Sequence, residues 1–233
     1  MYPAALAKYY RQKASWRSCS GPSPDGFDCA SVTVPVSYAQ PSKFGSIRIA
    51  MTRRPAGDIK NRLGSLIINP GGPGGSGIEY AQAADMVVSS AVLDRYDLVG
   101  FDPRGVGASS PVKCLGDKDI DAVLASDATP DTPAEVSTFQ RWSDKLGNGC
   151  VRNAPALAPR VDTESAARDM DIIRAVLGDK KMTYLGKSYG TFLGSTYARL
   201  FPNRVGRFVL DGVVDPALDN RGLSKSQAMG FER

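Results

Sequence analysis

A glycine-flanked serine is the first feature of the sequence that could do covalent chemistry. Residues 186–190 read GKSYG, which fits the pattern G-x-S-x-G with Ser188 at its centre. A short apolar run, residues 182–185 (MTYL), precedes the motif, and a helical pattern follows it. This context predicts a tight turn that lifts the hydroxyl of Ser188 above a strand end, where it can attack a carbonyl carbon. A glycine-rich turn with an idle serine is the alternative.

A second glycine-rich segment could stabilise the negative charge that such an attack creates. Residues 69–77 (NPGGPGGSG) follow the apolar run 65–68 (SLII). Glycines let backbone N–H groups approach a carbonyl oxygen closely, and Pro73 has no N–H to offer. We therefore expect the N–H groups of Gly72 and Tyr189 to form an oxyanion hole. The segment fits neither glycine pattern of nucleotide-binding loops, which argues against a phosphate site.

A general base for the serine is missing from the sequence, which contains no histidine. Without an imidazole the serine is a weak nucleophile, because loss of one member of a catalytic triad costs orders of magnitude in rate. Asp102 and Arg104 stand in a turn motif, residues 102–109 (DPRGVGAS), and could be catalytic. We expect them to brace neighbouring loops instead, and we interpret Asp211 and Asp215 as structural or loop residues.

The composition excludes several classes of protein. The 233 residues carry a net charge of +5, and their basic residues are scattered, whereas nucleic-acid-binding proteins concentrate positive charge on one face. No stretch approaches the roughly 20 apolar residues that span a bilayer. Residues 1–17 are aromatic and basic without an apolar run, so they do not read as a signal peptide. We expect no cofactor, no nucleic-acid partner and no membrane span.

The four cysteines fall into two local pairs, Cys19 with Cys29 and Cys114 with Cys150. Neither pair has the short spacing of a zinc site, and no histidine is available as a metal ligand. We expect two disulfides and no metal site, which indicates an oxidising compartment. Four buried reduced thiols remain the alternative.

Alternating strands and helices must position these segments. Residues 31–37 (SVTVPVS) and 46–54 (SIRIAMTRR) alternate apolar and polar side chains, which is typical of half-buried antiparallel strands. The unbroken apolar runs at 65–68, 98–101 (LVGF), 182–185 and 208–210 (FVL) are typical of parallel strands covered on both faces. Helices are expected at 163–177, capped by Asp162 or Thr163, and at 191–201. The pattern predicts an α/β fold with a mostly parallel, doubly wound sheet.

The chain divides into an N-terminal segment, residues 1–30, and the beginning of the α/β domain, residues 31–233. Residues 105–160 break the alternation and are rich in polar and turn-forming residues, with one helix expected near 134–146. So long an insertion is usually functional or part of a lid.

Four motifs in fixed order resemble one known family. They are PGGPGGSG, DPRGVGAS, GKSYGTFLG and FPNRVGRFVLDGVVDP, and the likeness covers residues 16–216. This combination is similar to the secreted bacterial tripeptidyl aminopeptidases, which are relatives of prolyl aminopeptidase among the α/β-hydrolase-fold serine peptidases. The resemblance implies secretion to the cell surface or medium, peptide substrates with a free N-terminus, and an acyl-enzyme on Ser188.

In that family the triad acid and histidine follow a helical cap and the last two strands. The resemblance therefore implies that this chain is the N-terminal part of an incomplete α/β-hydrolase fold, without its last strands and cap. It also implies a C-terminal fragment or second chain that completes the fold. Two other readings stay open: a non-catalytic binding protein that keeps the serine turn, and an esterase or amidase on the same scaffold.

Overall fold

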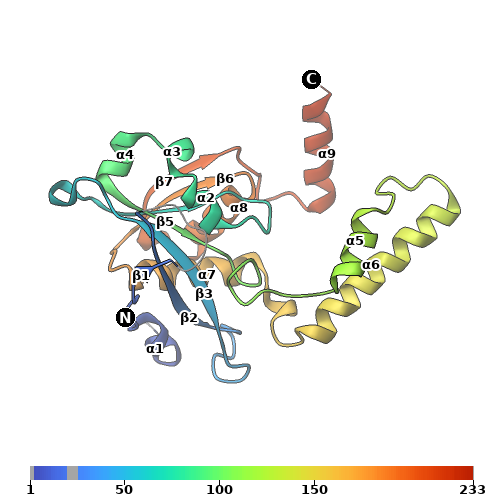
Figure 1. Cartoon of the computed structure of the whole chain (residues 1–233), viewed down its shortest axis with the longest axis horizontal. Coiled ribbons are helices and arrows are strands. Elements are labelled where there is room, and N and C mark those ends of the chain that lie inside the picture. Colours follow the sequence, from blue (N-terminus) through green and yellow to red (C-terminus); the bar gives the residue numbers. More distant parts are fainter. Residues whose placement is uncertain (1–2, 20–25, 233) are drawn as a thin grey trace.

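The computed structural model describes residues 3–19 and 26–232, and its centre is one seven-stranded sheet in the order β1-β2-β3-β5-β4-β6-β7 (Figure 1). The strands are β1 (Arg17–Ser18), β2 (Asp28–Pro35), β3 (Ser46–Arg54), β4 (Gly64–Asn69), β5 (Tyr96–Phe101), β6 (Met182–Lys187) and β7 (Val205–Asp211). The first three strands and the β3–β5 pair are antiparallel, whereas β5, β4, β6 and β7 run parallel. The sheet is therefore mixed, and its parallel half carries the predicted site segments.

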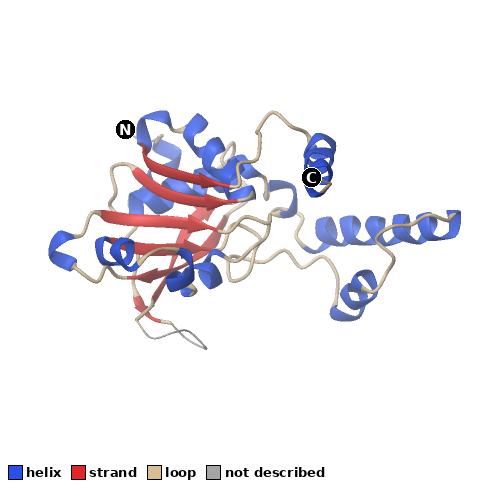
Figure 2. Cartoon of the chain, turned by 90° about the horizontal axis from the view of Figure 1, so that it is seen from above, coloured by secondary structure: helices blue, strands red, loops and turns tan. Residues whose placement is uncertain are grey.

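Helices cover both faces of this sheet, as expected for a doubly wound arrangement (Figure 2). They are α1 (Ala7–Tyr10), α2 (Gly77–Gln82), α3 (Ala84–Val87), α4 (Ser90–Arg95), α5 (Asp117–Leu124), α6 (Pro133–Asn153), α7 (Thr163–Val176), α8 (Tyr189–Leu200) and α9 (Asn220–Phe231). Short 3-10 turns are η1 (Ala4–Leu6), η2 (Ile59–Asn61), η3 (Ala158–Arg160) and η4 (Pro202–Arg204).

Two apolar clusters form the core, one on each face. Met170 and Ile173 of α7 and Tyr197 of α8 pack on one face, while Ala81 of α2 and Leu93 of α4 pack on the other. The strands β4, β5 and β6 lie between the two clusters and are almost wholly buried, which explains their unbroken apolar runs.

The expected helices form with small shifts at their ends. Asp162 caps α7, since its side chain accepts a hydrogen bond from the N–H of Ser165 at 2.8 Å. The helix expected at 191–201 begins two residues earlier, at Tyr189. Ser188 is therefore the residue that directly precedes the helix. The serine turn and the helix are thus one continuous unit.

The helix predicted near 134–146 forms as the longer α6, and the insertion holds a second helix that the sequence did not predict. Thr132 and Glu135 form a reciprocal capping box that starts α6, which continues through Gly147 and Gly149 to Asn153. The shorter α5 was missed. Both helices project from the sheet as an arm (Figures 1 and 2).

Both predicted disulfides form. Cys19 is bonded to Cys29 of β2, and Cys114, just before α5, is bonded to Cys150 of α6. No cysteine of the chain is free, so the alternative of four reduced thiols is excluded. The second disulfide closes the base of the arm.

The strand β7 lies at one edge of the sheet, and among the described strands it pairs with β6 alone. Phe208 and Leu210 pack against the core, whereas Val209 is 58% exposed. After this strand the chain continues to α9, which stands away from the sheet and has no buried residue (Figure 1). Among the described helices, none combines the length and the apolar character needed to cross a membrane.

Candidate active site

The backbone of Ser188 is held in a conformation that residues other than glycine rarely adopt. Its φ is 52° and its ψ is −124°, and its side chain is exposed at the carboxyl end of β6. Such a conformation costs on the order of 1–3 kcal/mol and persists only where the surroundings enforce it. The N–H of Ser188 donates to the carbonyl of Asp211 at 2.9 Å, and its own carbonyl accepts from the N–H and hydroxyl of Thr191. Strand, turn and helix therefore present the hydroxyl as the motif predicts.

Two glycines of the motif are required by close approach of the chain to itself. A Cβ on Gly186 would lie 2.4 Å from the carbonyl oxygen of Gly190, and a Cβ on Gly190 would lie 2.8 Å from that of Asn69. The carbonyl of Gly190 also accepts a hydrogen bond from the buried hydroxyl of Tyr184 at 2.7 Å. Any larger residue at either glycine would displace the turn that carries Ser188.

The glycine-rich loop after β4 lies directly against this turn. A Cβ on Gly71 would fall 2.9 Å from the amide nitrogen of Tyr189, so the two backbones touch there. The side chain of Asn69 fixes the loop by accepting from the N–H of Gly71 at 3.0 Å. Within residues 3–19 and 26–232, neither the N–H of Gly72 nor that of Tyr189 has an acceptor. The loop and the turn are thus brought together, while the choice of these two donors stays a prediction.

The side chain of Tyr189 is anchored away from the turn. Its hydroxyl shares a 2.6 Å hydrogen bond with the hydroxyl of Thr163 at the start of α7. Burial raises the pKa of Tyr189 above its ordinary value, so the ring is neutral near pH 7.

Lys187, the residue before Ser188, cannot replace the missing imidazole. The ammonium of Lys187 lies 3.5 Å from the carboxylate of Asp211. The Tyr80 hydroxyl and the Asp211 carboxylate raise the pKa of Lys187, so this group stays protonated near neutral pH and cannot accept a proton. Asp215 lies further along the loop, where its carboxylate accepts from the N–H of Ala217 at 2.9 Å.

Asp102 braces two loops, as the sequence led us to expect. One carboxylate oxygen accepts from the hydroxyl of Ser76 at 2.6 Å and from the N–H of Ile78 at 3.3 Å. The other accepts from the N–H of Ala108 at 2.9 Å. The buried carboxylate therefore ties the start of α2 to the turn that follows β5.

Arg104 forms a buried ion pair with Asp169 of α7, at 2.6 Å and 2.7 Å. Asp169 also accepts from the hydroxyl of Tyr38 at 2.7 Å. The remaining N–H donors of the guanidinium bind the backbone carbonyls of Pro35, Val36 and Arg160. All five donors of the guanidinium are thus occupied, and the group braces the fold. The sequence did not predict its partner, which lies 65 residues away in the chain.

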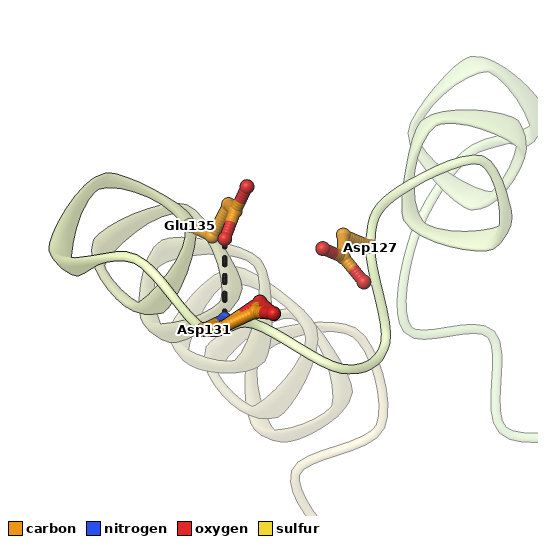
Figure 3. A group of neighbouring side chains, drawn as sticks. All are labelled: Asp127, Asp131 and Glu135. Carbon is orange, nitrogen blue, oxygen red and sulfur yellow. Dashed lines mark hydrogen bonds between the residues drawn. The ribbon is translucent and has the colours of Figure 1, made fainter.

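Three carboxylates gather on the arm, at Asp127, Asp131 and Glu135 (Figure 3). The Glu135 carboxylate accepts from the N–H groups of Asp131 and Thr132 at 3.1 Å and 2.8 Å, which completes the helix cap. The Asp127 carboxylate accepts from the N–H and hydroxyl of Thr129 in a local turn. The cluster is explained by these turn and cap contacts, and we assign no ion to it.

Comparison with known proteins places these features in a family. A family model described as alpha/beta hydrolase fold matches residues 64–233. A tripeptidyl aminopeptidase of Streptomyces coelicolor is 40% identical over 223 residues, which cover 92% of this chain and 40% of that protein. The serine protease Hip1 of Mycobacterium tuberculosis is 41% identical over 229 residues, covering 95% of this chain and 43% of that protein.

A third relative carries a different activity in its name. Carboxylesterase B of Mycobacterium tuberculosis is 40% identical over 226 residues, covering 94% of this chain and 43% of that protein. The chain therefore spans 40–43% of the length of these three relatives.

Proposed function

Since the chain belongs to the α/β-hydrolase-fold family, we propose that it supplies the nucleophile and the oxyanion hole of a serine aminopeptidase that acts on peptides with a free N-terminus. The observation that carries the proposal is the strained backbone of Ser188, which exposes a hydroxyl beside two amides without acceptors among the described residues. Similarity to relatives named as an aminopeptidase and a serine protease supports the substrate class.

In the proposed reaction the Oγ of Ser188 attacks the peptide carbonyl carbon and its proton passes to a histidine on a completing polypeptide. The carbonyl oxygen becomes an oxyanion, which accepts hydrogen bonds from the N–H groups of Gly72 and Tyr189. The C–N bond then breaks, the imidazolium gives its proton to the leaving amine, and the acyl group stays on Ser188 as an ester. Water, activated by the same histidine, hydrolyses that ester.

The completing polypeptide is proposed from three observations. The sequence has no histidine, and Lys187 next to Ser188 is held protonated. The relatives are more than twice as long as the matched region. The strand β7 offers an unpaired edge on which further parallel strands could form.

Co-expression with the C-terminal part of a full-length relative tests this proposal. We expect this chain alone to oligomerise or precipitate through the β7 edge, and the pair to elute as one soluble complex that hydrolyses peptides. Size-exclusion chromatography and a peptidase assay measure the two effects. A monodisperse monomer of this chain that turns over peptides unaided would contradict the proposal.

The oxyanion donor is tested by a pair of glycine variants. Gly72→Ala is expected to lower kcat of the assembled enzyme by about 10²–10³, because its Cβ would lie 2.9 Å from two neighbouring amide nitrogens and displace the donor. Gly74→Ala is the matched control: its φ of 98° is as strained as the 108° of Gly72, but its Cβ would meet nothing within 4 Å. Equal losses in kcat for both variants would assign the effect to loop strain instead.

An esterase is the second candidate, because a relative named carboxylesterase is as similar as the peptidases. Peptide p-nitroanilides with free and with acetylated N-termini, compared with p-nitrophenyl esters, separate the two activities. Preference for the free amine supports the aminopeptidase. A fluorophosphonate that fails to label Ser188 in the soluble complex would favour the non-catalytic binding protein.

The two disulfides support a secreted location for the protein.

A further inference from the structure

A pocket of ≈ 320 Å³ opens beside the proposed oxyanion hole. It lies between the glycine-rich loop, the turn after β5 and the start of α8. Its lining includes Tyr189, one of the two proposed donors, and Gly71 and Pro73, which flank the other donor, Gly72. Its size is at the lower end of the range of about 300–1,000 Å³ that is typical of ligand pockets. No step of the proposed reaction described above uses it.

The lining of this pocket is apolar. The residues that line it include Pro73, Val106, Val112, Val161, Tyr189 and Leu193. The one charged residue in the lining is Arg104, and all its N–H donors are already bound to Asp169 and to backbone carbonyls. A charged substituent would find no partner there, so the pocket suits a hydrocarbon group.

Two valines from the ends of the insertion meet in one wall of the pocket. A Cβ on Gly105 would lie 2.8 Å from a methyl group of Val161 and 3.2 Å from one of Val112, so both side chains close over that glycine. Val112 stands two residues before the Cys114 disulfide, and Val161 follows Arg160, whose carbonyl accepts from Arg104 at 3.1 Å. The arm base is therefore fixed to the pocket on both sides.

We propose that this pocket binds the apolar side chain of the substrate residue whose carbonyl Ser188 attacks, and that Val112 and Val161 set its size. The inference rests on the proposed serine-hydrolase function. The acyl part is the portion of a substrate that stays beside the oxyanion donors through both half-reactions. A pocket lined by Tyr189 and by the two neighbours of Gly72 therefore holds the acyl part.

The test uses the assembled enzyme and peptide p-nitroanilides with alanine, leucine or phenylalanine as the residue before the scissile bond. Val161→Phe fills the pocket, so kcat/KM for leucine and phenylalanine substrates should fall about 10–200-fold relative to alanine substrates. Val161→Ala enlarges it and should raise the phenylalanine-to-alanine ratio. Val151→Phe is the matched control, since Val151 is 56% exposed on α6 and lies outside the pocket lining.

Each outcome decides for or against the pocket. Equal changes in kcat/KM across the three substrates, or no change, would overturn the pocket assignment. A change in selectivity that appears when p-nitroanilides are replaced by aminocoumarin amides would also overturn it, because it would follow the leaving group. Fluorophosphonate labelling distinguishes failure of the proposed function from failure of the pocket assignment. If wild-type Ser188 is not labelled, the proposed function fails; if it is labelled and the selectivity profile is unmoved by the variants, only the pocket assignment fails.

Discussion

Replacing Ser188 by alanine is expected to lower kcat of the assembled enzyme by about a million-fold, the loss typical of a missing triad nucleophile. The acyl-enzyme cannot form without the Oγ, and what remains is the contribution of the oxyanion hole and of substrate binding. KM should change little, because the hydroxyl contributes to the chemical step more than to binding. A steady-state peptidase assay and intact-mass detection of the fluorophosphonate adduct measure the two consequences.

Ser110→Ala provides the matched control for that variant. Ser110 and Ser188 are the two described non-glycine residues with positive φ, at 48° and 52°. Both substitutions remove a hydroxyl from a left-handed backbone, but only one removes the proposed nucleophile. Peptidase activity of Ser188→Ala above about a thousandth of wild type would contradict the covalent mechanism, since residual catalysis by the rest of a serine site lies far lower. Association with the completing polypeptide should survive, because the substitution removes only the Oγ and keeps the N–H of residue 188 that donates to Asp211 at the end of β7.

The parts of the site that follow local rules could be predicted from the sequence. The strand of residues 182–185, the turn at Ser188 and the helix after it are consecutive, and each carries its own signal in apolar runs and glycines. The loop after β4 could be placed beside the turn because parallel neighbouring strands end at the same edge of a sheet. Both disulfides followed from pairs of cysteines close in sequence.

Long-range contacts between unrelated segments could not be predicted. Nothing in the sequence around Val112 or Val161 indicates that the two valines meet over Gly105, because the contact depends on how the insertion leaves and re-enters the domain. The shorter helix of the arm was missed because α5 spans only eight residues, three of them aspartates, and buries none of them. Asp169 is one of three acidic residues within α7, and its role depends on where Arg104 arrives in three dimensions.

That buried pair gives the second large expected effect, which is on stability. Replacing Arg104 by methionine is expected to lower the free energy of unfolding by about 3–5 kcal/mol, the range found when one partner of a buried ion pair is removed. The side chains of Arg104 and Asp169 are 0% and 1% exposed, so water cannot take over the lost contacts. Of its donors among the described residues, the Asp169 carboxylate would keep the hydroxyl of Tyr38 alone. Urea unfolding of the assembled protein, followed by intrinsic fluorescence, measures the change.

Two further variants test whether the loss of stability comes from leaving the Asp169 carboxylate buried without its partner. Adding Asp169→Leu to Arg104→Met removes that charge and should recover part of the loss. Recovery should stay incomplete because the carbonyls of Pro35, Val36 and Arg160 still lack the donors that Arg104 gave them. Arg199→Met is the surface control: Arg199 pairs with Glu164 at side-chain exposures of 63% and 51%, and exposed pairs contribute about 0–1 kcal/mol. A loss for Arg104→Met as small as that of the control would show that the pair does not brace the fold. Arg104 donates to the carbonyl of Arg160, the residue before Val161. The Arg104→Met variant should therefore also reduce the selectivity between alanine and leucine substrates.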